Sequence, residues 1–336
     1  MTAQRHRLAL DVAQDRLPLT APFTITGYTF VDWPFVVATL RDGEAVGQGE
    51  ASGVYYLGDD AARMVVDIEA VRGEIEDGAD RQALQSLLPP SGARNALDCA
   101  LWDLEAKRAG KPVWALAGLA APRALLTTFT LGAAEPGAMA AGAVAYGHAK
   151  ALKLKLTGDA GLDAERVKAV RAARPDVWLG VDANQGFTPD SLEALLPTLL
   201  ASDVMLVEQP FARGREADLD GLSSPIPIAA DESVLGFDDL EGLVGRVHIV
   251  NLKLDKCGGL TEGLKMAAEA RRLGFGVMVG NMVGSSLAMA PAFILGQLCD
   301  IVDLDGPIFL ARDRAPSVVY QDGLISYPAH GWGAAA

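Results

Sequence analysis

The chain has 336 residues, half of them hydrophobic, which is enough for one large domain or two unequal ones. A net charge of −14 without any basic stripe argues against nucleic acid as a partner. The cysteines Cys99, Cys257 and Cys299 have neither a zinc-site spacing nor a disulfide framework, and the first residues contain no apolar signal segment. We therefore expect a cytoplasmic protein.

The first part of the chain has the pattern of an α+β domain. Alternating apolar residues predict antiparallel strands, and the Asp42–Gly43 pair predicts a hairpin turn between them. Ser91 is expected to cap a long helix that Gly110 ends. The expected strands lie at 7–19 and 29–51, and the expected helices at 59–76, 80–88 and 91–111. We expect residues 1–120 to form a capping domain, which the C-terminal tail, about 315–336, completes.

From about residue 125 onward, short apolar runs alternate with helical patterns. Eight such units predict an α/β fold, a modified (β/α)8 TIM-type barrel over residues 121–314. The expected strands lie at 125–132, 151–156, 177–184, 205–210, 225–233, 249–256, 275–281 and 301–307. The 27 uncharged residues between Arg272 and Asp300 divide into a strand, a glycine-rich turn and a helix, so we expect no membrane span.

Three carboxylates end three successive strands of this pattern. Asp182, Glu208 and Asp231 lie in the runs VDAN, VEQP and ADES, with spacings of 26 and 23 residues, about one strand plus one helix each. Side chains at the same end of successive parallel strands converge, and three converging anions need a cation. All-oxygen ligands favour a hard divalent ion, so the sequence predicts Mg²⁺ first and Mn²⁺ second.

Lysines occupy other strand ends of the same barrel. Residues i and i+2 of a strand share a face, so Lys153 and Lys155 point together, and Lys253 lies four strands away, across the barrel mouth. Burial and the second cation favour a neutral Lys155, which is a competent base. Two lysines facing each other over a metal-held carboxylate predict proton removal on one face of a carbon and return on the other, as in racemisation or epimerisation. The metal would stabilise the enediolate that forms.

The remaining charged residues near these positions fall into pairs. Asp303 and Asp305 share one strand face, and their mutual repulsion predicts a cationic partner. Asp255 and Lys256 follow Lys253 directly; the sequence allows them to pair with each other, and we expect both to lie behind the residues that line the site. The histidines are expected to be neither ligands nor bases, because all four fall outside the strand ends: His6, His148, His248 and His330.

Taken together, these motifs resemble the enolase superfamily in its muconate-lactonising branch, most closely dipeptide epimerases of the L-Ala-D/L-Glu type. The resemblance covers nearly the whole chain, including the runs at 92–110, 153–156, 181–184, 207–210, 230–233, 251–262 and 303–307. It implies Mg²⁺ binding by Asp182, Glu208 and Asp231, and acid–base roles for Lys155 and Lys253. It also implies that Asp303 and Asp305 hold the free α-ammonium of a dipeptide, and that Thr128 and Lys153 contact substrate.

Two departures from the family pattern leave the dipeptide open. The early capping loop, residues 21–30, has no Arg or Lys, and Asn281 stands where a small thiol residue is more usual. The second residue of the dipeptide is therefore acidic or apolar. An o-succinylbenzoate synthase, muconate cycloisomerase or N-succinylamino acid racemase remains the alternative within the superfamily, and a binding barrel without turnover is a third reading. A homo-oligomer is expected, although no interface can be recognised in the sequence.

Overall fold

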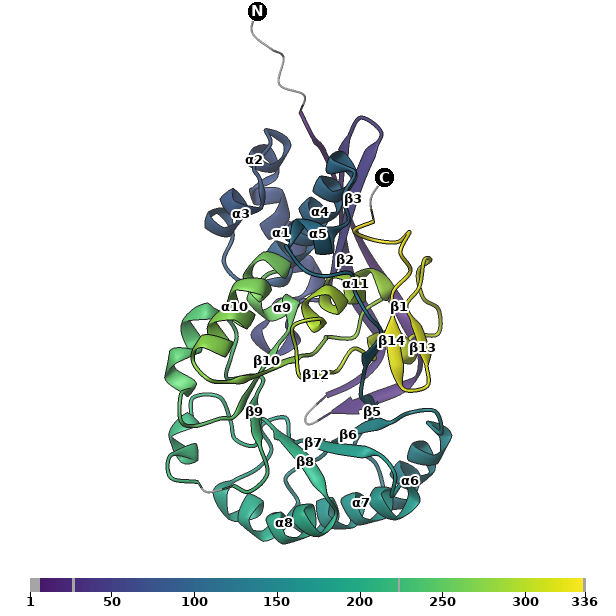
Figure 1. Cartoon of the computed structure of the whole chain (residues 1–336), viewed down its shortest axis with the longest axis vertical. Helices are drawn as coiled ribbons and strands as arrows, with labels where there is room; N and C mark the ends of the chain where they lie inside the picture. Colours follow the sequence, from purple (N-terminus) through teal and green to yellow (C-terminus); the bar gives the residue numbers. More distant parts are fainter. Residues whose placement is uncertain (1–6, 26–27, 223, 335–336) are drawn as a thin grey trace, which may run out of the picture.

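The computed structural model describes residues 7–25, 28–222 and 224–334. Its N-terminal part contains a three-stranded antiparallel sheet in the order β1 (Ala9–Ile25), β2 (Tyr28–Asp42) and β3 (Ala45–Ala51). Gly43, at a φ of 59°, begins the turn between β2 and β3, as the Asp-Gly pair predicted. In Figure 1 this sheet forms one long edge of the molecule and extends from the upper part down beside the barrel.

Helices cover one face of this sheet. They are η1 (Tyr55–Leu57), α1 (Ala61–Ala70), α2 (Arg72–Glu76), α3 (Arg81–Leu87), α4 (Gly92–Ala109) and α5 (Val113–Leu116). The predicted ends of α4 are confirmed: the Ser91 side chain accepts from the Arg94 N–H, and Gly110 is left-handed. Gly47 and Gly49 let α4 approach closely, because a Cβ at either would lie 2.2 Å from a carbonyl oxygen of α4.

The rest of the chain forms a curled parallel sheet with its strands in sequence order. The eight strands are β5 (Phe129–Leu131), β6 (Ala151–Lys155), β7 (Trp178–Asp182), β8 (Val204–Glu208), β9 (Ile228–Ala230), β10 (Ile249–Leu252), β11 (Gly276–Val279) and β12 (Ile301–Val302). The Thr128 N–H donates to the Val302 carbonyl at 3.0 Å, which links the two ends of the sheet. The predicted TIM-type barrel with an N-terminal α+β part is confirmed (Figure 1).

One predicted strand divides in two. Residues 125–132 were expected to form a single strand, but β4 (Leu125–Leu126) pairs with β14 (Leu324–Ser326), which pairs with β13 (Val319–Gln321). Only β5 joins the barrel. The Thr127 N–H still bonds to the tail, at Gly323, so the chain leaves one sheet and enters the other within three residues.

The connections between barrel strands are unequal. Full helices follow five of the strands, β5, β6, β7, β10 and β11, whereas the connections from β8 to β10 contain only single turns of helix. The longer helices are α6 (Pro136–Ala145), α7 (Ala160–Ala173), α8 (Pro189–Ala201), α10 (Leu260–Arg272) and α11 (Ser286–Gly296). The short ones are η2 (Glu216–Leu219), η3 (Phe237–Asp239), η4 (Glu241–Leu243), α9 (Leu254–Cys257) and η5 (Gly306–Phe309).

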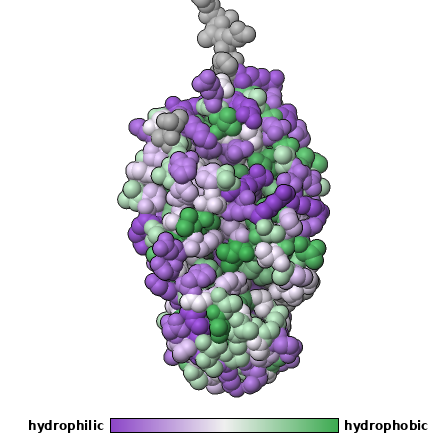
Figure 2. Space-filling view, turned by 90° about the vertical axis from the view of Figure 1, so that its right-hand side faces the viewer, coloured by the Kyte–Doolittle hydropathy of each residue, from purple (hydrophilic) through white to green (hydrophobic). Residues whose placement is uncertain are grey.

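The predicted reading of the long uncharged stretch is also confirmed. It forms β11, a glycine-rich turn and α11, and most side chains of α11 are buried. Within the described residues, no helix is both long enough and apolar enough to cross a bilayer. On the face drawn in Figure 2, hydrophobic residues occur in small groups separated by hydrophilic ones.

The C-terminal segment returns to the N-terminal part. The Trp332 indole N–H donates to the Gln48 carbonyl at 2.8 Å, and the Gly333 N–H donates to the Asp103 carboxylate at 2.8 Å. The Val113 N–H in turn donates to the Gly333 carbonyl at 2.8 Å. These bonds agree with the expected role of the tail, while the domain boundaries at 120 and 314 stay a prediction.

Candidate active site

Strand register brings the predicted residues together inside the barrel. Lys155 on β6 lies beside Asp182 on β7, and Asp182 lies beside Glu208 on β8. Glu208 is paired with Ala229 on β9, so Asp231, two residues further, points the same way. Each of these strands therefore contributes one charged group to the same end of the barrel.

Below these charges the barrel interior is apolar. Leu206, Ala229 and Met278 are fully buried there, and Trp178, Ile249 and Ile301 pack against them. Some of these side chains share a strand face with the charged ones, as Trp178 does with Asp182 and Leu206 with Glu208. The charged groups consequently lie above an apolar layer of side chains and face the mouth of the barrel.

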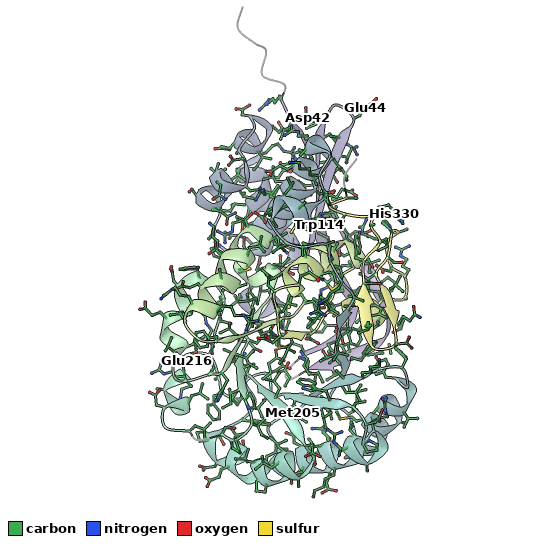
Figure 3. The ribbon with its side chains drawn as sticks, viewed as in Figure 1. Asp42, Glu44, Trp114, Met205, Glu216 and His330 are labelled. Carbon is green, nitrogen blue, oxygen red and sulfur yellow. The ribbon has the colours of Figure 1, made fainter. Side chains whose placement is uncertain are left out.

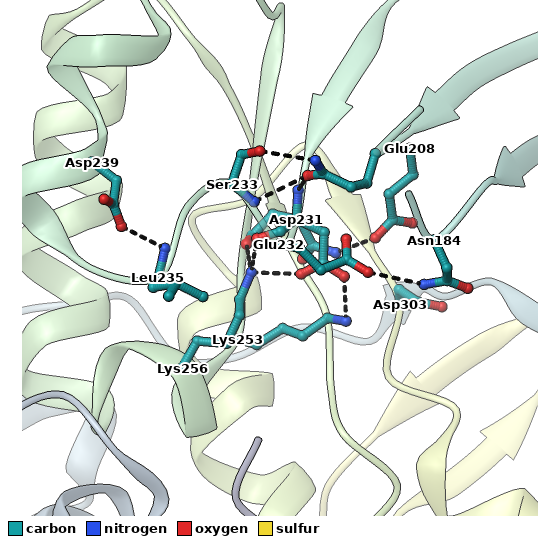
Figure 4. Close-up of polar contacts among 12 residues, drawn as sticks. Asn184, Glu208, Asp231, Glu232, Ser233, Leu235, Asp239, Lys253, Lys256 and Asp303 are labelled. Atoms are coloured by element: carbon teal, nitrogen blue, oxygen red, sulfur yellow. Dashed lines mark hydrogen bonds and ion pairs between the residues drawn. The ribbon is translucent and has the colours of Figure 1, made fainter. Parts of the chain in front are cut away.

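Every predicted metal ligand is paired with a lysine. Lys155 Nζ lies 2.6 Å from Asp182 Oδ2, Lys153 Nζ lies 3.1 Å from Glu208 Oε2, and Lys253 Nζ lies 2.6 Å from Asp231 Oδ2. Figure 4 shows the pairing of Asp231. All three carboxylates are buried, so these lysines neutralise charges that water cannot reach.

The predicted substrate residues form a second network. Thr128 Oγ1 and Lys153 Nζ both donate to the Asp303 carboxylate, so the cation expected next to Asp303 is Lys153. Asp305 Oδ2 accepts from the Thr130 N–H at 2.6 Å. In the part of the chain that the structure describes, no lysine or arginine forms an ion pair with Asp305. Among the described residues Glu232 shares this lack of a cationic partner and accepts only from Asn184 Nδ2, at 3.3 Å.

The pKa values of the lysines follow from these contacts. Burial alone lowers the pKa of Lys153, but Asp303, Glu208 and Asp182 outweigh it and hold that pKa well above its usual value. Burial likewise opposes charge on Lys253, whose pKa Asp231 and Glu208 nevertheless raise. Both lysines are thus ammonium ions at neutral pH in this arrangement.

Three carboxyl groups of the site have raised pKa values, because burial and neighbouring carboxylates disfavour their charged forms. Burial, followed by the repulsion of Asp182, raises the pKa of Glu208 to about 7. Burial and Asp231 raise the pKa of Glu232 to about 8, and burial and Asp303 raise the pKa of Asp305 to about 6. Negative charge at this end of the barrel therefore exceeds what the lysines neutralise.

Asp255 and Lys256 do not pair with each other, which corrects the sequence prediction. Lys256 Nζ lies 2.5 Å from Asp231 Oδ1 and donates to the Asn251 carbonyl at 3.0 Å. Asp255 Oδ1 instead accepts from the N–H groups of Ser52 and Gly53 at 2.8 and 2.9 Å. The two neighbours therefore point in different directions: Lys256 fixes a candidate metal ligand, and Asp255 holds the N-terminal part.

The residues fit a divalent cation by charge and by donor type. Carboxyl groups outnumber lysines here by six to four: Asp182, Glu208, Asp231, Glu232, Asp303 and Asp305 against Lys153, Lys155, Lys253 and Lys256. Three buried oxygens, Asn184 Oδ1, Glu232 Oε2 and Asn251 Oδ1, accept no hydrogen bond. With the lysines in place, no three acidic, His or Cys side chains among the described residues are arranged around one point as metal ligands.

The N-terminal part closes the mouth with aromatic side chains. The cavity beneath them is lined by residues of both the N-terminal part and the barrel. We call five of its lining residues the aromatic wall: Phe23, Trp33, Tyr55, Tyr56 and Phe309. Tyr55 and Tyr56 begin η1, just after the segment that Asp255 holds. Burial raises the pKa of both phenols, which stay neutral.

Several functional groups at this site were missed in the sequence. Asn251 Nδ2 donates to Glu208 Oε1 at 2.7 Å, a contact that its shared parity with Lys253 indicated. Gln209, at a φ of 36°, accepts the Asp231 N–H at 2.8 Å and so fixes the backbone next to a candidate ligand. Asn184 and Glu232 follow Asp182 and Asp231 closely in their motifs, and Asn184 Nδ2 donates to Glu232 Oε1 at 3.3 Å.

The histidines in the described residues do not reach this site. His248 Nδ1 accepts from the N–H of Ile228, the first residue of β9, at the opposite end of the strand from Asp231. His330 lies in the C-terminal segment (Figure 3). His148 contacts the ring of Phe129 edge-on, and His6 falls outside the described residues.

The fold and this constellation define an enolase-type barrel enzyme. Residues 137–335 match the family model described as enolase C-terminal domain-like, and residues 7–118 match the mandelate racemase/muconate lactonizing enzyme N-terminal domain. The chain therefore belongs to the mandelate racemase/muconate lactonizing enzyme family.

Individual relatives agree with this assignment. The chain is 38% identical to the L-Ala-D/L-Glu epimerase of Escherichia coli, over 94% of this chain and 98% of the relative. An enolase family member from Agrobacterium tumefaciens with homology to dipeptide epimerases, with bound sodium and L-Ala-L-Glu, has a TM-score of 0.93 at 41% identity, covering 96% and 98% of the two chains. A dipeptide epimerase from Methylococcus capsulatus, complexed with Mg and L-Arg-D-Lys, has a TM-score of 0.89 at 30% identity, covering 96% and 97%. The chain is accordingly an isomerase of the epimerase class.

Proposed function

We propose that this enzyme epimerises the α-carbon of the C-terminal residue of an L-Xaa-Xaa dipeptide. The observation that carries the proposal is the pair of buried lysines at the ends of β6 and β10. Lys155 and Lys253 are each held by a separate carboxylate, at 2.6 Å, on strands four apart in the barrel. An α-carbon held between them meets a base on each face.

In this proposal the two lysines exchange roles with the direction of the reaction. One Nζ takes the α-proton while the other returns a proton to the opposite face, and inversion follows without a further base. Lys153 stays an ammonium ion, because Asp303 and Glu208 hold its pKa well above the usual value. Lys153 would therefore balance charge and, with Thr128, position the substrate.

We propose that Asp182, Glu208 and Asp231 hold Mg²⁺, or Mn²⁺ in its place. Support comes from the excess of carboxyl groups over lysines, from the all-oxygen donor set and from the orphaned oxygens of Asn184, Glu232 and Asn251. A divalent ion at this place makes the proton α to a bound carboxylate acidic enough for an amine to remove. The Agrobacterium and Methylococcus proteins hold sodium and Mg, respectively.

Asp305 supports a substrate with a free amine. It is buried, its pKa is raised to about 6 by burial and by Asp303, and no cation pairs with it in the described part of the chain. An α-ammonium group would satisfy it, whereas an N-acyl group or an acidic cycloisomerase substrate would not. We therefore rank the racemase, synthase and cycloisomerase alternatives below the dipeptide epimerase. We also propose residues 1–120 with about 315–336 as the capping domain and 121–314 as the catalytic domain.

The test is solvent exchange. The Mg²⁺-loaded enzyme is incubated in D₂O with a library of L,L-dipeptides, and mass and chiral chromatography follow the products. We expect a gain of one mass unit at the C-terminal α-carbon together with the L,D epimer. Absence of exchange with every dipeptide, in a sample whose bound Mg²⁺ is measured, would contradict the proposal.

A further inference from the structure

We propose that the residue inverted by this enzyme carries an aromatic or large aliphatic side chain, which packs against the aromatic wall, and that acidic side chains are rejected. This inference rests on the proposed function and specifies its substrate. It follows from which groups line the cavity, from where each lies relative to the lysines, and from the charge of the site.

The rings of the aromatic wall form two contacting groups within one hydrophobic cluster. The rings of Phe23 and Phe309 have centroids 4.6 Å apart, and those of Trp33 and Tyr55 lie 6.3 Å apart in an edge-to-face arrangement. The Tyr55 and Tyr56 rings meet edge-on at 5.2 Å. Such a surface binds apolar groups by burial and aromatic rings by quadrupole contacts in addition.

The position of the tyrosines links the wall to the inverted carbon. Tyr55 and Tyr56 line the same cavity as Lys155 and Lys253. Phe309 follows the Asp305 end, where the substrate ammonium is placed. A side chain on an α-carbon between Lys155 and Lys253 would therefore share this cavity with the wall, and Met282 and Val283 add further apolar lining.

No cation remains for an acidic side chain. The cationic residues among the described lining are Lys153, Lys155 and Lys253, and each is bound to a carboxylate. On the β1–β2 hairpin, Arg16 is committed to Asp32 at 2.8 Å. A glutamate side chain would bury a carboxylate without a counterion in a site that already carries excess negative charge, which is strongly unfavourable.

One neutral donor completes the cavity. Tyr56 Oη is buried and has no hydrogen-bond partner in the structure. A phenol that stays protonated can donate to a substrate carbonyl or hydroxyl. The cavity therefore offers aromatic surface and the unpartnered O–H of Tyr56, which suits phenylalanine, tyrosine and leucine side chains.

The test compares kcat/KM for D₂O exchange with L-Ala-L-Phe, L-Ala-L-Leu, L-Ala-L-Gln and L-Ala-L-Glu. Gln and Glu have the same shape and differ in charge. One methylene group in an apolar pocket changes kcat/KM by about 10–200-fold. We therefore expect kcat/KM for the Phe and Leu dipeptides to exceed that for the Glu dipeptide by at least about 100-fold. Equal or faster exchange of L-Ala-L-Glu overturns the inference and leaves the proposed function intact. Silence with all four, and with the wider library, overturns the proposed function itself.

A variant pair separates charge from shape. Phe23 is half-buried at the rim, so Phe23→Arg places a cation there and Phe23→Met serves as its matched control. We expect the ratio of kcat/KM for the Glu dipeptide to kcat/KM for the Phe dipeptide to be at least about tenfold higher in Phe23→Arg than in Phe23→Met. One hydrogen bond to a charged group changes an equilibrium constant by about that factor. A ratio within one protein cancels any loss of folded enzyme. No shift in that ratio would refute the wall as the surface that selects the side chain.

Discussion

Replacing Asp255 by alanine should loosen the attachment of the N-terminal part to the barrel. The carboxylate is buried in α9, and one oxygen accepts both the Ser52 N–H, at 2.8 Å, and the Gly53 N–H, at 2.9 Å. Alanine leaves both donors buried without a partner. The backbone there cannot easily turn away. Gly53 has a φ of 69°, and a Cβ at this position would lie 2.0 Å from the Asp59 carbonyl oxygen.

The expected cost can be worked from those two donors. A buried N–H left unsatisfied costs about 1–3 kcal/mol, so Asp255→Ala should lower the free energy of unfolding by about 2–6 kcal/mol. That is a large fraction of the roughly 5–15 kcal/mol typical of folded proteins. Tyr55 and Tyr56 follow the released segment, so KM for the dipeptide should rise as well.

The assay is urea unfolding followed by tryptophan fluorescence, together with steady-state kinetics. Asp60→Ala is the matched control: Asp60 is an exposed carboxylate that accepts one backbone N–H, from Arg63 at 2.9 Å, and loss of such a cap typically costs about 1 kcal/mol. The reasoning is refuted if Asp255→Ala is no less stable than Asp60→Ala. A lower midpoint with unchanged KM would confirm the anchor but contradict its link to the tyrosines.

Four further outcomes are expected. Lys155→Met and Lys253→Met should each lower kcat by about 10²–10⁴-fold. Each variant should still exchange the α-proton of one of the two epimers, which chiral separation followed by mass measurement would show. Asp305→Asn should lower kcat/KM for dipeptides with a free amine by about 10–150-fold, the equivalent of one charge-assisted hydrogen bond. An unchanged kcat/KM would contradict the proposal that Asp305 binds the ammonium group. A chelator should abolish exchange, added Mg²⁺ should restore it, and the thermal midpoint should rise with Mg²⁺ concentration. Burial raises the pKa of Asp255 to about 7, so its contribution to stability is complete below about pH 4 and is lost as pH rises through 7. Asp255→Asn carries no such proton, and its unfolding free energy should lack that fall between pH 4 and 7 in denaturant titrations.

The catalytic end of the barrel was predictable because strands have a simple period. Lys153 and Lys155, like Asn251 and Lys253, alternate with apolar residues, and parallel register then places them at one end. The error at Asp255 and Lys256 has a local cause. The strand period ends at Lys253, where α9 begins, so Lys256, three residues later on a helix, returns to the side of Lys253.

Other features depend on contacts that no local pattern encodes. The split of residues 125–132 is imposed by β14, nearly 200 residues further along the chain. Tyr55 and Tyr56 reach the barrel mouth because Asp255, 202 residues after Gly53, fixes the segment before them. Sequence periodicity indicates which face a side chain takes, but not which distant backbone holds it there.

The return of the C-terminal segment to α4 has a consequence for synthesis on the ribosome. Asp103, buried in α4, accepts from the Gly333 N–H, 230 residues later, and β4 pairs with β14, which is made nearly 200 residues later. At about 5–20 residues per second, the ribosome takes roughly 10–50 s to make that interval. During this time the helix and the β4 edge expose groups that the finished protein covers. We expect the nascent chain to bind chaperones until residues 324–333 emerge, and the aromatic wall to assemble after the barrel strands.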